Sequence, residues 1–187
     1  MKKAISILVI IFSISPLFSS SIMIESGYTG DYIFSEKPEV MENNVPLKAT
    51  LMLDVGNSYS LSLGAGAFFS PQGDKYSGIN TGLEVDYLNY FHIGFGDVVH
   101  LRLGGGLIYT YTPMKVTGRN AFDNVLTIAL ALNTEVVIMS HLSLNLTAYA
   151  GYNLIDMTVF ENESIATLDL GKNTMRWQIA LGVGYAF

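Results

Sequence analysis

Cysteine, charge and long apolar runs are absent or scarce in this chain. None of its 187 residues is a cysteine, which excludes disulfide bonds and lipid attachment through an N-terminal cysteine. Charged residues make up 14% of the chain, well below the ~25% of soluble domains. Hydrophobic residues make up 50%, yet no uninterrupted run reaches the ~18 residues of a membrane helix. A membrane β-barrel is the main class that remains.

The N-terminus has the pattern of a secretory signal peptide. Lys2 and Lys3 precede an apolar run that ends at Ile14, and serines follow it as small residues for cleavage. The run is short and is followed by a proline, which disfavours an uncleaved membrane anchor. We therefore expect residues 1–21 to be a cleaved signal peptide and residues 22–187 to form a single domain.

The exported chain is acidic. The signal peptide holds two of the ten basic residues and none of the sixteen acidic ones, which leaves eight against sixteen and a formal charge of −8. Nucleic acid requires a basic surface, so it is not expected as a partner. The same balance leaves no polybasic segment for an anionic lipid surface.

Apolar side chains occupy every second position in eight segments, which is the pattern of β-strands. In the last segment, apolar residues from Met175 to Phe187 alternate with small or polar ones from Thr174 to Ala186. The other segments lie near residues 22–28, 47–55, 59–69, 79–87, 99–111, 126–133 and 142–152. Unpaired backbone groups in lipid cost several kcal/mol each, so such a sheet must close. We predict an all-β fold, a closed antiparallel eight-stranded transmembrane β-barrel.

A soluble barrel of the lipocalin type is the alternative fold, with the apolar face lining a ligand cavity. The non-apolar face is mostly Gly, Ser, Ala and Thr, which suits the narrow interior of eight strands better than a solvated surface. The bulky Trp, Tyr and Leu side chains of the other face would crowd that interior. We therefore favour the membrane orientation.

Connections between the predicted strands alternate in length. Short turns are expected at 57–58 and 140–141, with a somewhat longer turn at 92–97. Longer loops, with most of the proline, asparagine and charge, are expected near 31–46, 70–78, 113–123 and 153–173. This alternation is typical of outer-membrane barrels, whose short turns are periplasmic and whose long loops are extracellular.

Outward aromatic residues fall into two layers, as expected for rings at the two membrane interfaces. The outer layer is predicted to contain Phe69, Tyr109, Tyr111, Tyr152 and Trp177. The inner layer is predicted to contain Tyr59, Tyr87, Tyr185 and Phe187. We interpret the two layers as aromatic girdles.

The last strand carries a further pattern, in which alternate positions lead to a C-terminal aromatic residue: Ile179, Leu181, Val183, Tyr185 and Phe187. This resembles the terminal strand by which the bacterial barrel assembly machinery recognises its substrates. With a signal peptide and eight strands, the chain resembles the small OmpA/OmpX-like barrels. The resemblance implies a monomer in outer-membrane lipid, delivered by periplasmic chaperones. A peptidoglycan-binding role is not expected, because no such domain follows Phe187.

Charged residues on the inward face form a predicted interior network of Glu84, Asp86, His100, Arg102 and Glu135. We expect Arg102 to bridge Glu84 or Asp86 on one side and Glu135 on the other. Because an isolated ion inside the barrel costs several kcal/mol, these groups must be paired or hydrated. We interpret the network as a structural plug; the alternative is a gated polar path for protons or small ions. Arg176 is a further inward charge without a predicted partner.

Catalytic, cofactor and metal sites are not expected. Some eight-stranded barrels are lipid A deacylases, and His141, Ser143 and a downstream Glu161 or Glu163 supply the residue types that they use. Here the His–Ser pair is predicted to face inward at a periplasmic turn, whereas a lipid-modifying site must reach the outer leaflet. No metal-ligand spacing links the three histidines, His92, His100 and His141.

We expect a specific function to be carried by the long loops, since loops on a rigid scaffold mediate recognition. The loops near 31–46 and 153–173 each have a net charge of −3, and the loop near 113–123 has +1. We hypothesise a structural or adhesion-like role at the cell surface through these acidic loops, toward an unidentified extracellular ligand. The alternatives are a narrow pore for ions or small solutes and, second, a lipid-modifying enzyme.

Overall fold

The computed structural model describes nine strands and the turns that join some of them. It covers residues 19–33, 39–55, 58–70, 80–95, 98–116, 119–161, 166–170 and 174–187. The strands are β1 (Ser19–Ile33), β2 (Glu39–Val55), β3 (Tyr59–Ser70), β4 (Asn80–Phe95), β5 (Val99–Val116), β6 (Arg119–Met139), β7 (Leu142–Phe160), β8 (Ala166–Leu170) and β9 (Thr174–Ala186). Across these residues, no helix is long and apolar enough to cross a membrane.

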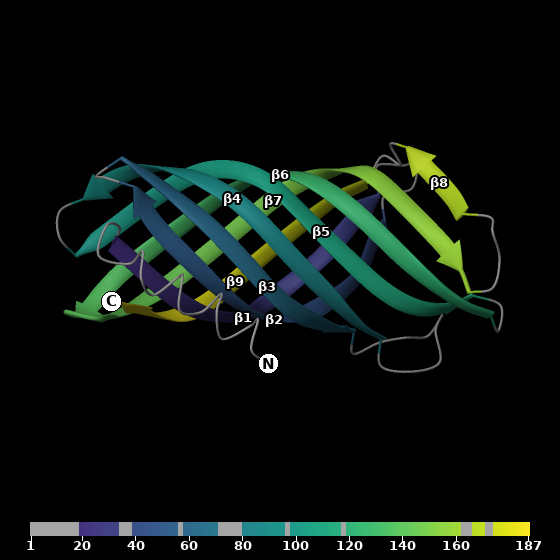
Figure 1. Ribbon diagram of the computed structural model, residues 1–187, viewed down its shortest axis with the longest axis horizontal. Helices are drawn as coiled ribbons and strands as arrows, with labels where there is room; N and C mark the ends of the chain where they lie inside the picture. Colours follow the sequence, from purple (N-terminus) through teal and green to yellow (C-terminus); the bar gives the residue numbers. More distant parts are fainter. Residues whose placement is uncertain are drawn as a thin grey trace, which may run out of the picture.

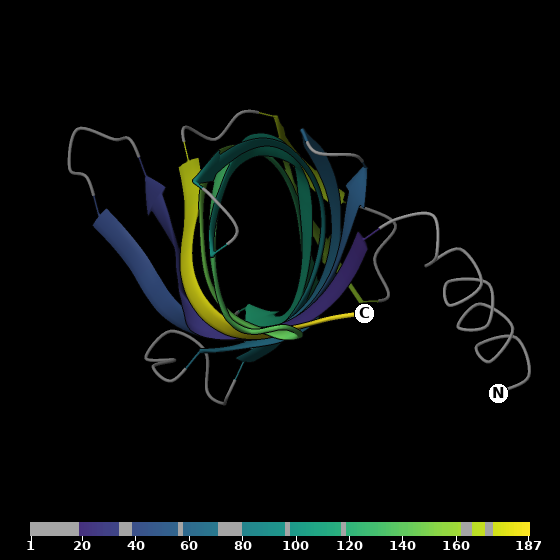
Figure 2. The same cartoon turned by 90° about the vertical axis from the view of Figure 1, so that its left-hand side faces the viewer.

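Eight of the strands close into a barrel. Each of β1 to β6 pairs with the next strand in antiparallel fashion, β7 pairs with both β6 and β9, and β9 pairs with β1. Viewed along its axis, the sheet forms a complete ring (Figure 2). The remaining strand, β8, pairs only with the last part of β7, from Ile155 to Val159. The predicted closed eight-stranded barrel is therefore confirmed, with a short ninth strand outside the ring.

The faces of the strands alternate as the sequence predicts. On β9, Arg176, Gln178 and Ala180 are buried, while Leu181 is 68% exposed. On β6, Leu130 is 76% exposed beside the buried Ala129 and Ala131. On these strands, small and polar side chains therefore face the interior and apolar ones cover the outside. This orientation rules out the lipocalin-type alternative, in which the apolar face would line a cavity.

Both chain ends of the described barrel lie at the end that carries the short turns. The Phe187 amide donates to the Ser20 carbonyl at 2.9 Å, and the Ala186 amide donates to the His141 carbonyl at 2.9 Å. The β6–β7 turn at 140–141 is as short as predicted. Most of the predicted signal peptide lies outside the described residues, although β1 already begins at Ser19.

The chain turns between Phe95 and Val99, which are paired. The predicted turn at 92–97 therefore begins too early, because β4 continues to Phe95. In this stretch Leu88 and Tyr90 point inward and are buried, while Phe91 and Ile93 are exposed on the outside. Both faces are therefore apolar here, and the period-two pattern that marks a strand is lost from the sequence.

Much of the predicted loop sequence at the other end of the barrel is also strand. Between them, β5 and β6 cover most of the segment 113–123, and β7 and β8 cover much of 153–173. Figure 1 shows these strands extending past the rest of the barrel at the end that carries β8. In this region the register shifts, with Leu126 opposite Ile155 and Thr127 opposite Asn153. Such a bulge interrupts the alternation on which the sequence prediction relied.

The segment 31–46 likewise contains the end of β1 and the start of β2 rather than one long loop. The predicted loop residues Glu36, Lys37, Glu163 and Lys172 lie outside the described residues, as does nearly all of the predicted loop 70–78.

Candidate functional site in the barrel interior

The centre of the barrel holds an ion cluster around one lysine. Lys48 Nζ on β2 lies 2.8 Å from Asp86 Oδ2 and 3.7 Å from Glu84 Oε1, both on β4. All three side chains are buried. The lysine reaches across β3, where the register places Gly66 between Lys48 and Glu84. A Cβ at Gly66 would overlap the backbone of Leu47 and Lys48, and a Cβ at Gly64 would overlap the Asp86 carboxylate, so glycine is required on this part of β3.

Tyr149 connects this cluster to the opposite wall. Its hydroxyl lies 3.0 Å from Glu84 Oε2 and 3.2 Å from Gln178 Oε1. Its ring lies 5.8 Å, centroid to nitrogen, from Lys48 Nζ, within the range of a cation–π interaction. A side chain from β7 thus spans the interior to meet residues on β2 and β4. Eight strands enclose a space just wide enough for such side chains.

Glu25 extends the central cluster toward β1. Thr50 donates to Glu25 Oε2 at 2.8 Å, and Thr147 donates to Glu25 Oε1. The alternation of the first strand places Glu25 on the inward face, yet neither Glu25 nor Lys48 is part of the predicted network. Their positions in the alternating pattern could have identified them, since both are charged residues at inward positions.

A second ion cluster lies nearer the end with the short turns, around Arg102. The guanidinium lies 2.7 Å from Glu135 Oε2 and 3.6 Å from Asp54 Oδ1, and it donates to Asn133 Oδ1 at 3.0 Å. The structure therefore brings together Arg102 and Glu135. His100, half-buried, is paired with Glu135 in the β5–β6 register.

The expected contact of Arg102 with Glu84 or Asp86 is wrong. In the β4–β5 register Arg102 stands opposite His92, six residues along β4 from Asp86. The two carboxylates are bound by Lys48 instead. The predicted single network is therefore two clusters at different depths, each with its own cation.

His92, Asp54 and Ser60 form a group that the sequence did not single out. Ser60 donates to Asp54 Oδ1 at 2.5 Å and also contacts His92 Nε2, while Asp54 Oδ1 lies 3.4 Å from the same nitrogen. Arg102 Nε donates to His92 Nε2 at 3.3 Å. A catalytic triad needs the carboxylate on the imidazole nitrogen opposite the serine. Here both groups meet Nε2, so this set is part of the Arg102 cluster rather than a nucleophilic site.

The interior end away from the short turns is filled by Arg176 and Phe68. Arg176 Nη1 donates to Thr110 Oγ1 at 2.9 Å, and its guanidinium carbon lies 5.4 Å from the Phe68 ring centroid. Both side chains are 3% exposed. A Cβ on Gly82 would overlap the Phe68 ring, so this part of the interior has little free room.

The residues of the lipid-modifying alternative are not assembled. His141 is exposed and stacks on the outward ring of Tyr185, with ring centroids 5.7 Å apart, and its Nδ1 lies 3.1 Å from the Ala186 carbonyl. Ser143 is buried and accepts a hydrogen bond from Asn145 at 3.0 Å. Only Ser143 faces inward as predicted. Glu161 lies at the far end of the barrel, where Asn120 donates to it at 2.6 Å.

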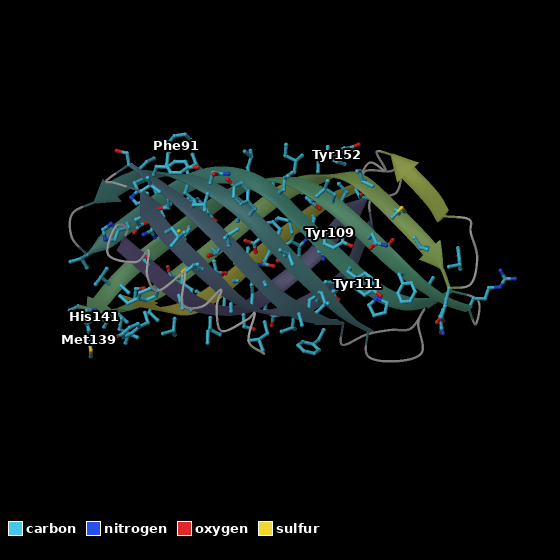
Figure 3. All side chains as sticks on the ribbon, in the orientation of Figure 1. Phe91, Tyr109, Tyr111, Met139, His141 and Tyr152 are labelled. Carbon is cyan, nitrogen blue, oxygen red and sulfur yellow. The ribbon has the colours of Figure 1, made fainter. Side chains whose placement is uncertain are left out.

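Outward aromatic rings lie toward both ends of the wall. In Figure 3, Phe91 lies toward the end that carries His141 and Met139, and Tyr109, Tyr111 and Tyr152 lie toward the other. Tyr59 packs edge-on against Phe91, with centroids 6.0 Å apart. Tyr87 stands four residues along β4 from Phe91, opposite Leu63 and Leu107. Tyr87 therefore lies between the two layers of aromatic residues. Phe91 occupies the inner-layer position that was predicted for Tyr87.

Comparison with solved structures identifies the architecture. The Neisserial surface protein NspA matches with a TM-score of 0.67 and 9% identity, over 90% of this chain and 97% of that one. OprG from Pseudomonas aeruginosa matches with 0.61 and 14%, over 90% and 96%. The attachment invasion locus protein Ail of Yersinia pestis matches with 0.56 and 13%, over 91% and 99%. This is the fold of the small outer-membrane β-barrels.

No protein-family model and no curated protein sequence matches the chain. The eight-stranded barrel with an apolar outer wall that the sequence predicts is nevertheless confirmed by the closed sheet and its exposed apolar side chains, and these structural neighbours share its fold. Within the described parts of the barrel, no three His, Cys, Asp or Glu side chains are grouped to hold a metal ion.

Proposed function

We propose that the protein is a sealed outer-membrane barrel whose function lies at its extracellular end, as a surface-interaction protein. The observation that carries this proposal is the filled interior. Three layers of contacts follow one another through the barrel, centred on Arg102, Lys48 and Arg176. Buried charges of this kind are stable only when paired, and we take these three layers of paired side chains to close the barrel to ions.

The extension of β5 to β8 beyond the ring supports an extracellular role. Asn120 donates to Glu161 and Thr158 donates to Asp123 at 3.1 Å, which ties the upper parts of β6 and β7 together. Sheet of this kind holds loops in a defined arrangement, and recognition residues occur preferentially on such loops.

The charge of the chain favours a basic partner. One structure of Ail contains the heparin analogue sucrose octasulfate, a polyanion. The present chain has sixteen acidic and ten basic residues, and its predicted outer loops carry much of that excess. Like charges repel, so we propose that its extracellular ligand is cationic rather than a sulfated polysaccharide.

Two measurements test the proposal. In planar bilayers, the purified barrel is expected to give no steady channel openings. With the barrel in vesicles, a cationic polymer such as polylysine is expected to bind in a salt-dependent manner and heparin is not, with protein-free vesicles as the control. Heparin binding, or equal polylysine binding to empty vesicles, would contradict the proposal that the ligand is cationic. Steady channel openings would contradict the proposal that the barrel is sealed.

A narrow pore is the second candidate, and one observation favours it. Glu84 Oε1, Asp86 Oδ1 and Gln178 Nε2 are buried without a hydrogen-bond partner within the described part of the chain. Buried polar atoms normally find a partner or an ordered water. If water reaches them from both ends, the same recordings will show small steady openings, and Arg102→Gln will change their conductance.

A further inference from the structure

The outer wall of the barrel has an apolar patch beyond the layer of Tyr109. Three rows of directly paired residues cross β5, β6 and β7. We call these nine residues the upper wall patch: Tyr109, Leu126 and Ile155; Tyr111, Asn124 and Met157; and Pro113, Phe122 and Val159. All of them are half-buried or exposed. Tyr111 and Phe122 stack with centroids 5.6 Å apart, and Figure 3 shows Tyr109 and Tyr111 near this end.

The polar groups of the upper wall patch are bonded to one another. Asn124 Oδ1 accepts from the Tyr109 hydroxyl at 2.7 Å. Asn124 Nδ2 lies 3.3 Å from the Met157 carbonyl and 3.4 Å from the Phe122 carbonyl. An amide surrounded by apolar groups is stable only when its hydrogen bonds are made. This amide makes them within the patch and does not need water.

Among the described residues, charged side chains border the patch at its far edge, where Arg119 and Glu161 are exposed. Asn120, which lies two residues before Phe122 on β6, is also exposed and donates a hydrogen bond to Glu161. At its other edge the patch continues without a polar break into Ile128 and Tyr152, which are 50% and 38% exposed. It is therefore continuous with the lipid-facing wall.

This wall is taller than the one on the other side of the barrel. On β3, the outward apolar residues run from Tyr59 to Phe69, which at ~3.3 Å per residue and a ~40° tilt gives roughly 25 Å. On β6, the outward positions from Val136 to Phe122 span roughly 35 Å on the same basis, with Thr134 and Asn124 as their polar members. The first value matches the ~25 Å apolar band of an outer membrane, and the second exceeds it.

We infer that the upper wall patch binds the acyl chains of outer-leaflet lipid, and that the barrel tilts or thickens the leaflet locally to cover it. Tilting and local thickening are the usual responses to an apolar surface longer than the bilayer. Lipid is favoured over a protein partner because the patch adjoins the lipid-facing wall and has no charged residue of its own. This inference is independent of whether the barrel conducts and of what its loops bind.

Single cysteines test the inference, since the chain has none of its own. Met157→Cys reports on the patch, Leu130→Cys on the mid-wall lipid, and Arg119→Cys on water beyond the patch. Each variant carries a nitroxide and is placed in phosphatidylcholine vesicles. Collision with oxygen marks lipid, and collision with a water-soluble nickel chelate marks water. Val159→Cys replaces Met157→Cys should the latter fail the heat-dependent gel shift of a folded barrel.

The label at position 157 is expected to resemble that at Leu130, with high oxygen and low nickel accessibility. In a series of lipids with shorter chains, it should become accessible to nickel before the Leu130 label does. Nickel accessibility equal to that at Arg119 in long-chain lipid would overturn the inference. So would exclusion of both reagents with spin–spin broadening that grows with protein density, because that result means a second copy of the chain covers the patch.

Discussion

The two ion clusters of the interior are built from the same kinds of residue but lie in different surroundings. In the central cluster, the side chains of Lys48, Glu84 and Asp86 are all at most 3% exposed. In the cluster around Arg102, the Asp54 side chain is 22% exposed and that of Glu135 is 9% exposed. Lys48 is the cation that pairs with the two buried carboxylates of the central cluster, whereas water can replace part of the pairing around Arg102. The contribution of an ion pair to the stability of the barrel should therefore depend on how deeply its side chains are buried.

The largest effect is expected from removing the central cation. Lys48→Met keeps the side-chain length but leaves Glu84 and Asp86 buried without a positive charge, which should lower the free energy of unfolding by about 3–5 kcal/mol. Denaturant unfolding in lipid vesicles measures this loss. Adding Glu84→Gln and Asp86→Asn to the same chain should restore most of it. A triple variant no more stable than Lys48→Met would show that lost packing, not charge, is responsible.

Arg102→Gln is expected to have a smaller effect, about 1–3 kcal/mol. Glutamine can still donate a hydrogen bond to Glu135, and Asp54 can turn to water at the barrel end. The same unfolding assay compares the two cations directly. If Arg102→Gln costs as much as Lys48→Met, depth does not distinguish the clusters and the comparison fails.

Tyr149→Phe separates the contribution of one hydroxyl from that of the charges in the central cluster. It removes only the hydroxyl that contacts Glu84 and Gln178, and it retains the ring beside Lys48. The expected loss is about 1 kcal/mol, the net value of one buried hydrogen bond. Tyr90→Phe, on another buried tyrosine of the interior, serves as a parallel measurement of hydroxyl removal.

The smallest effect is expected from Asp54→Asn. This residue accepts from Ser60 and lies 3.6 Å from Arg102, but it is the most exposed acid of the two clusters. The amide keeps an acceptor oxygen, so the change in unfolding free energy should stay within about 1 kcal/mol, as for partly hydrated ion pairs. A loss as large as that of Lys48→Met would mean that water does not compensate at this end.

The sequence alone predicted the parts of the molecule in which one face differs clearly from the other. On β9, large apolar residues alternate with small or polar ones over the whole strand, and the structure exposes and buries them accordingly. The same contrast located Glu84, Asp86, Arg102 and Glu135 in the interior. Where both faces are apolar, as around Leu88 and Phe91, the prediction placed a turn inside a strand.

Tertiary structure decided which of the inward residues meet. Which cation binds which acid depends on register and on the space left by intervening residues, as with Gly66 between Lys48 and Glu84. Neither is a property of one strand by itself. The same holds for the upper parts of β6 and β7, whose pairing places Ala121 opposite Phe160, far along the chain. Local alternation determined the barrel and its inside-out faces, whereas non-local pairing determined the two ion clusters and the taller wall.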